Sequence, residues 1–149
     1  MTIRQLQQKI VKACYEANSK EFSFEEAANP TIPGCQVIFE FGLADGDEFS
    51  YIDGEELEKT SNLLETTQLD TMDFFCAVRY YKGGDAKRNA LKFDYYFIRT
   101  LYGKAILEVQ VYHKKGLRYI SPEDLVLFIA KRVNEGAKKQ ILKKQSSGD

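Results

Sequence analysis

The sequence is short of the residues that carry most recognisable chemistry. Its 149 residues contain no tryptophan, three prolines, three cysteines and one histidine, His113. Cys14, Cys35 and Cys76 lie far apart and form neither a CxxC pair nor a metal-ligand spacing, which favours a reduced intracellular protein. No apolar run approaches the ~20 residues of a membrane helix, and the first residues lack the apolar stretch of a secretion signal. These absences predict a cytoplasmic location.

What the sequence does contain is typical of one globular domain. Its length predicts a single domain over residues 1–149, with a frayed tail over 145–149. Hydrophobic residues make up 44% of the chain, and nine tyrosines and ten phenylalanines predict an aromatic core. A chain of this size buries roughly 70% of its extended surface on folding, so it needs no disulfide or metal to stabilise it.

Charge is sorted by position along the chain. Residues 21–73 hold fourteen acidic groups and one basic group, whereas residues 74–148 hold sixteen basic groups and six acidic groups. The net charge of −1 therefore hides two opposed regions. A molecule that keeps such regions apart is suited to steering a charged partner or to pairing with itself.

Local patterns predict the elements of the first half. Apolar residues at helical spacing, capped by Thr2, predict a helix over 3–18. Ser23 and Glu26 fit a capping box for a helical turn over 24–29. Strict alternation predicts a strand over 35–41, and the turn after it predicts a short returning strand over 49–52. Asp53 then caps a predicted helix that ends near Glu65.

The second half predicts three strands and a helix. Residues 72–82, 91–100 and 105–111 each alternate, and short links between them predict an antiparallel meander. Ser121 at the N-cap and Pro122 at the first helical position predict a long C-terminal helix whose apolar face continues to Ile141. The fold class is therefore α+β, in the order α-β-β-α-β-β-β-α, with a single mostly antiparallel sheet packed against helices.

This order of elements, with its acidic middle, resembles the layout of the secretion-chaperone-like α+β proteins. The predicted strands divide as two and then three, whereas those chaperones divide them as three and then two. The resemblance is one of layout, and it implies a dimeric module that binds protein.

The turn between the last two strands decides which side chains face each other. A three-residue loop, Leu101–Gly103, would place Phe97 opposite Leu107 and Ile98 opposite Ile106. It would also put Gly103 at the third position, where a left-handed backbone is preferred. We predict this register with a positive φ at Gly103, so that Gly103→Val would strain the backbone.

The second face of the predicted meander is half apolar and must be covered by a helix, a partner or a ligand. We predict that Phe75, Tyr96, Ile98 and Ile106 are largely buried, partly across a two-fold interface. The candidate binding surface consists of Phe75, Tyr96, Ile98, Ile106 and Tyr112.

No pattern predicts a catalytic residue, a metal site or a cofactor. His113 has no evident nucleophile, since the three cysteines fall on elements predicted to be core. A glycine-rich loop, Gly83-Gly84 with Lys87-Arg88, lacks the frame of a phosphate-binding loop.

The sequence also disfavours a calcium loop. The acidic residues 45, 47, 53 and 56 fall on its frame, but Phe49 replaces a ligand and Ser50 replaces the essential glycine. A hairpin turn followed by a capped helix explains the same residues.

Three functions follow from these features. The leading hypothesis is a non-enzymatic protein-binding or self-associating module, acting as a dimer. The alternative is a small-molecule binder or small enzyme that uses the aromatic face as a pocket, with Tyr95, Tyr96, Arg99 or His113 as polar groups. The third is a nucleic-acid accessory protein that uses the basic patch Lys138, Lys139, Lys143 and Lys144, which the sequence pI of 5.9 disfavours.

Overall fold

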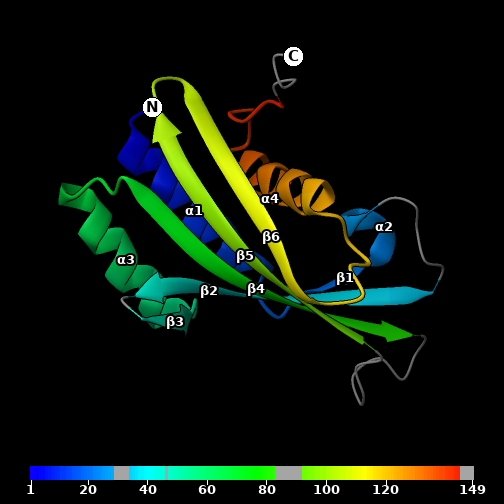
Figure 1. The fold of residues 1–149 in the computed structure, drawn as a ribbon. Helices are drawn as coiled ribbons and strands as arrows, with labels where there is room; N and C mark the ends of the chain where they lie inside the picture. The colour runs from blue at the N-terminus through cyan, green and yellow to red at the C-terminus, as the bar shows by residue number, and fades with distance from the viewer. Residues whose placement is uncertain (29–33, 46, 83–91, 145–149) are drawn as a thin grey trace.

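The computed structural model describes residues 1–28, 34–45, 47–82 and 92–144. They form a single six-stranded antiparallel sheet and four helices, which confirms the α+β class (Figure 1). The helices are α1 (Ile3–Ala17), α2 (Phe24–Ala27), α3 (Gly54–Thr66) and α4 (Pro122–Ala137). The strands are β1 (Glu21–Ser23), β2 (Cys35–Asp45), β3 (Glu48–Tyr51), β4 (Thr71–Lys82), β5 (Lys92–Gly103) and β6 (Ile106–Gly116). None of these described helices is long and apolar enough to cross a membrane.

The helices begin where the sequence predicts. Thr2 and Gln5 form a reciprocal capping box at α1. The side chain of Asp53 accepts a hydrogen bond from the backbone of Glu56 at the start of α3, and Ser121 does the same for Asp124 at α4. Each cap satisfies a backbone donor that the first helical turn leaves unpaired, so a local signal is enough to place it.

The sheet has the order β1-β2-β4-β5-β6, and β3 pairs with β2 on the same edge as β1. Strands β4, β5 and β6 form the predicted antiparallel meander. Helices α1 and α4 pack against each other and lie behind the meander in Figure 1, while α3 packs on the other side of α1. The core lies between the helices and one sheet face. Its aromatic centre contains Phe39, stacked on Phe41 and Phe128 at ring distances of 5.8 and 4.3 Å.

The predicted register of the last hairpin is wrong. The turn is the two-residue Lys104-Ala105, with Gly103 opposite Ile106, so Phe97 lies opposite Tyr112 and Ile98 opposite Val111. The positive φ belongs to Ala105, at 60°, and not to Gly103. The strand β5 carries large side chains on both faces, so alternation in its sequence does not identify the buried face.

The last helix is shorter than predicted. It ends at Ala137, and Lys138 adopts a left-handed conformation with φ of 58°. The side chain of Asn134 then bonds the backbone of Ile141 and Leu142, which folds the following segment back on the helix. This side chain supplies the partners that a continuing helix would otherwise provide.

Candidate functional site

One face of the sheet points away from α1 and α4, and we call it the open face. Along β4 and β5 the residues alternate between buried and more exposed positions, with the buried set facing the helices. The open face carries aromatic side chains from β3, β4, β5 and β6, among them Phe49, Phe75, Phe93, Tyr95, Phe97 and Tyr112.

These rings form a connected network across four strands. Phe49 lies over two neighbours, with ring centroids 5.6 Å from Phe75 and 6.2 Å from Phe97. Phe75 stacks on Tyr95 at 5.7 Å, and Phe97 lies 6.1 Å from Tyr112. Such offset and edge contacts stabilise aromatic pairs beyond their buried area, so the network is held in place before any partner binds.

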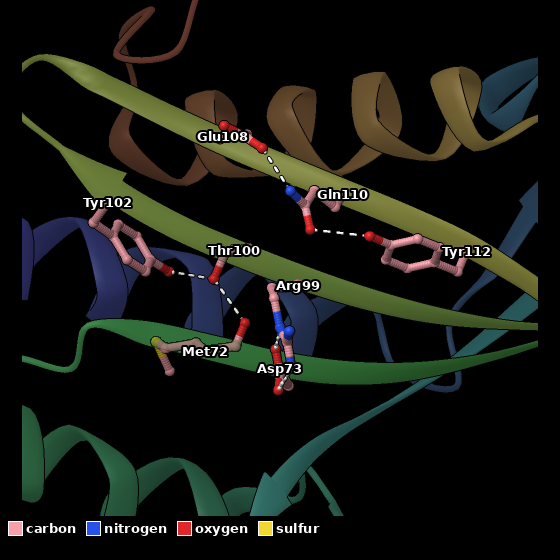
Figure 2. Close-up of polar contacts among 8 residues, drawn as sticks. All are labelled: Met72, Asp73, Arg99, Thr100, Tyr102, Glu108, Gln110 and Tyr112. Carbon is pink, nitrogen blue, oxygen red and sulfur yellow. Dashed lines mark hydrogen bonds and ion pairs between the residues drawn. The ribbon is translucent and has the colours of Figure 1, made fainter.

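Charged side chains on the open face pair with each other. Arg99 makes two hydrogen bonds to Asp73, at 2.9 and 3.0 Å, and its guanidinium lies 5.6 Å from the centre of the Phe97 ring (Figure 2). Arg79 forms an ion pair with Glu40 through one hydrogen bond. In each pair the acid comes from the acidic part of the chain and the base from the basic part, so the sheet joins the two regions.

The outermost strand adds a polar row to the open face. Gln110 donates a hydrogen bond to Glu108 at 2.6 Å and accepts one from the Tyr112 hydroxyl at 3.1 Å (Figure 2). These contacts orient three successive outward side chains of β6. Ile106, at the start of the same strand, is 56% exposed.

The structure divides the predicted binding residues between the two faces. Phe75, Ile106 and Tyr112 lie on the open face, as their strands predict. Tyr96 and Ile98 instead lie on the core face and are 0% and 1% exposed. The prediction that they share a surface with Ile106 is wrong because the true turn shifts β5 by an odd number of residues, which exchanges its faces. The sequence analysis therefore missed Phe93, Phe97 and Phe49 as surface residues.

His113 belongs to a buried polar cluster around Asp94, which the sequence did not single out. The Asp94 carboxylate is 0% exposed and accepts hydrogen bonds from the Tyr80 hydroxyl at 2.6 Å and the backbone N–H of Arg118 and Tyr119 at 2.6 and 2.9 Å. His113 Nε2 lies 2.8 Å from the same carboxylate. Burial, together with the hydrogen bond that its hydroxyl donates to Asp94, raises the pKa of Tyr80 well above its ordinary value. These partners explain the cluster as a structural junction.

The cysteines do not provide a nucleophile for His113. All three are buried and unpaired. Burial raises the pKa of Cys14 to about 12, and burial also raises the pKa of Cys76. Because the thiolate is the reactive form of cysteine, these two side chains behave as core residues.

The described residues also contain no cluster of three side chains suited to a metal ion. Asp53, part of the calcium frame, is occupied as the cap of α3. Gly83, Gly84, Lys87 and Arg88 lie outside the described residues. The four lysines of the predicted basic patch all lie after the end of α4, in the segment that folds back on the helix. Lys144 forms an ion pair with Glu123 at 2.5 Å.

Comparison of the chain with protein-family models, with curated proteins and with solved structures finds no match. No matched family therefore supports the resemblance in layout to the secretion chaperones. The function is argued below from the geometry of the open face.

Proposed function

We propose that this protein is a non-enzymatic, cytoplasmic protein-binding module that works as a homodimer and holds its partner on the open face. The observation that carries the proposal is the connected aromatic network, which lies on the solvent side of the sheet. The chemistry of the remaining residues agrees with a binding role, since the buried cysteines and the engaged His113 are accounted for by the fold.

The exposed apolar area supports this proposal. Phe49, Phe93, Ile106 and Tyr112 are 44%, 42%, 56% and 48% exposed. At about 200 Å² for each full side chain, these four residues alone expose about 400 Å². Patches of this size on soluble proteins often mark interaction sites. The half-buried rings of Phe75, Tyr95 and Phe97 lie between them and extend the surface.

The distribution of charge favours a protein over a nucleic acid. Single-stranded nucleic acid is bound by aromatic rings that lie within a basic groove. Here Arg79 and Arg99 of the open face are paired with acids, and Lys115 lies opposite Tyr95 near the end of β6. The basic patch lies after α4, on the helix side of the sheet. The aromatic network and the basic patch therefore lie on different sides of the sheet.

A double variant of the open face tests the proposal. Phe49→Thr with Phe93→Thr removes two exposed rings while leaving the core face unchanged. Leu127→Gln, at an exposed apolar position of α4 with 41% exposure, is the matched control. Each immobilised protein is incubated with nuclease-treated cytoplasmic extract, and the retained proteins are quantified by mass spectrometry.

We expect a defined set of proteins that the parent protein and the control retain and that the double variant loses by about tenfold or more, equivalent to about 1.4 kcal/mol. Circular dichroism establishes that all three are folded. Equal retention by the double variant contradicts the proposal. A set of proteins retained from untreated extract only, and lost on Lys→Ala changes in the basic patch, favours the nucleic-acid function instead.

A further inference from the structure

The strand β6 is a long open edge of the sheet. It has eleven residues and pairs with β5 alone among the described strands. The opposite edge is divided between β1 and β3, which have three and four residues. Very short edge strands resist pairing with other chains, whereas a long edge exposes a row of unpaired backbone donors and acceptors.

The first part of β6 lacks the features that protect an edge strand. Residues 106–113 contain no proline, and Glu108 is the one acidic or basic group apart from His113. The register irregularity lies opposite Tyr95 and Tyr96, so the ladder is regular from Ile106 to His113. Edge strands that stay single usually carry charges, prolines or bulges along their length. This segment therefore has the properties of a strand that is covered by another strand.

The hairpin geometry shows which backbone groups are available. The two-residue turn makes Gly103 and Ile106 a hydrogen-bonded pair. Backbone hydrogen bonding alternates from residue to residue along an antiparallel ladder. The even-numbered residues from Ile106 to Tyr112 therefore make their backbone hydrogen bonds to β5. The N–H groups of Leu107, Val109 and Val111 consequently point outward.

We propose that β6 pairs antiparallel with β6 of a second copy of this chain, with Gln110 on the two-fold axis. Residues at equal distances from Gln110 then face each other, so Val109 lies opposite Val111 and Glu108 lies opposite Tyr112. The outward N–H groups bond to the partner, and Gln110 forms a pair without backbone bonds, in which side chains approach closely.

Charge and polarity favour a second copy as the occupant. Self-pairing in this register places the Glu108 carboxylate of one copy opposite the uncharged Tyr112 of the other, whose hydroxyl donates to Gln110 of its own strand, and no like charges are directly opposed. The apolar side chains of Val109 and Val111 meet on the core side, where both are already half-buried. Cross-strand pairs of these kinds stabilise antiparallel sheets.

The resulting dimer has one continuous sheet, with both open faces on the same side because the two-fold axis runs perpendicular to the sheet. Two aromatic networks then lie side by side and can engage one partner bivalently. This consequence rests on the proposed function, whereas the pairing of β6 does not.

The test uses opposite charges at the axis. Gln110→Lys and Gln110→Glu each place like charges opposite one another in a homodimer, whereas an equimolar mixture of the two variants places opposite charges there. Sedimentation velocity from low to high micromolar concentration measures the dissociation constant of each sample. We expect each single variant to weaken the dimer by about fivefold or more, and the mixture to restore it.

A second variant addresses the backbone. Val109→Pro removes an outward N–H without removing a bond to β5, so we expect a folded monomer. Phe49→Thr with Phe93→Thr should leave the dimer intact. A monomeric parent protein, or a dimer that the mixture does not restore, overturns the inference. A dimer lost only in the open-face variant also overturns it, while leaving the open face as the binding surface.

Discussion

Asp94 organises the junction between the sheet and the last helix. The chain turns sharply after β6, with positive φ at Gly116 (111°) and Arg118 (59°). A side chain on Gly116 would place its Cβ 2.3 Å from the Asp94 carboxylate, so only glycine fits this approach. The buried carboxylate satisfies two backbone donors of the turn and the Tyr80 hydroxyl. A single acid therefore stabilises a conformation that its neighbours would not adopt alone.

We expect Asp94→Ala to destabilise the protein by about 3 kcal/mol or more, since each buried donor left without a partner costs about 1–3 kcal/mol. Tyr80→Phe removes one donor and leaves the carboxylate with its other partners, so a smaller loss of about 1–2 kcal/mol is expected. Urea denaturation measures both. A change below about 1 kcal/mol for Asp94→Ala would show that the cluster is not a structural junction.

At the scale of single elements, β5 shows why a strand can be recognised while its orientation is not. Its existence follows from its run of aromatic and β-branched residues. Its core face contains Asp94 and Thr100, whereas its open face contains Phe93 and Phe97. A reading that assigns the apolar set to the core therefore selects the wrong face. The polar core residues are tolerated because each is hydrogen-bonded, Thr100 to the carbonyl of Met72 at 2.9 Å.

The observed turn moves the position that favours glycine from Gly103 to Ala105. Ala105 has φ of 60°, which costs an L-residue about 1–2 kcal/mol. Ala105→Gly should therefore stabilise the protein by about 0.5–1 kcal/mol, after the added entropy of the unfolded chain is counted. Thermal denaturation provides the measurement.

Gly103→Ala is the matched control for this turn. An added Cβ there meets the Ile106 carbonyl at an ordinary 3.8 Å, so we expect a change within about 0.5 kcal/mol. A large loss at Gly103 combined with no gain at Ala105 would favour the three-residue loop instead.

At the scale of the whole molecule, charge is separated among the helices and interleaved in the sheet. The acidic helix α3 lies on one side of α1, and α4, followed by the basic segment, lies on the other (Figure 1). In the sheet, Arg79 and Arg99 pair with acids from the other half of the chain. The acidic α3 and the basic segment after α4 thus contribute part of the charge separation of the molecule.

The buried phenols predict a loss of stability in alkali. The Tyr102 hydroxyl donates to Thr100, whose own hydrogen goes to Met72, and burial raises the pKa of Tyr102 to about 12 (Figure 2). Burial also raises the pKa of Tyr80 and of Tyr96. The folded state binds these protons more tightly than the unfolded state does. Their contribution to the free energy of unfolding is therefore complete below pH 10, the ordinary pKa of tyrosine, and is lost as the pH rises above it.

We expect the free energy of unfolding to fall above about pH 10, by up to about 1.4 kcal/mol per pH unit for each phenol. For Tyr102 the loss continues until about pH 12. Urea titrations at several alkaline pH values measure the slope, and Tyr102→Phe should reduce it. A pH-independent stability across this range would contradict the burial of these groups.

The sequence by itself determined the elements that depend on neighbours along the chain. The caps at Thr2, Asp53 and Ser121 act within one helical turn, and the strands of the meander depend on their own composition, so both could be predicted together with the α+β class. The open face was recognised as half apolar, and Phe75, Ile106 and Tyr112 were assigned to it. Tyr95 was named only as a polar group of the alternative pocket, and Phe49, Phe93 and Phe97 were not assigned to this face.

The tertiary structure decided the features that depend on contacts distant in sequence. The exposed side of β5 depends on a two-residue turn and on the partners of Asp94, which come from β4 and from the segment before α4. The end of α4 depends on Asn134 capturing a returning segment. In each case a buried or half-buried polar side chain is stable only because a group distant in sequence forms a hydrogen bond with it. The pattern of neighbouring residues does not identify that partner.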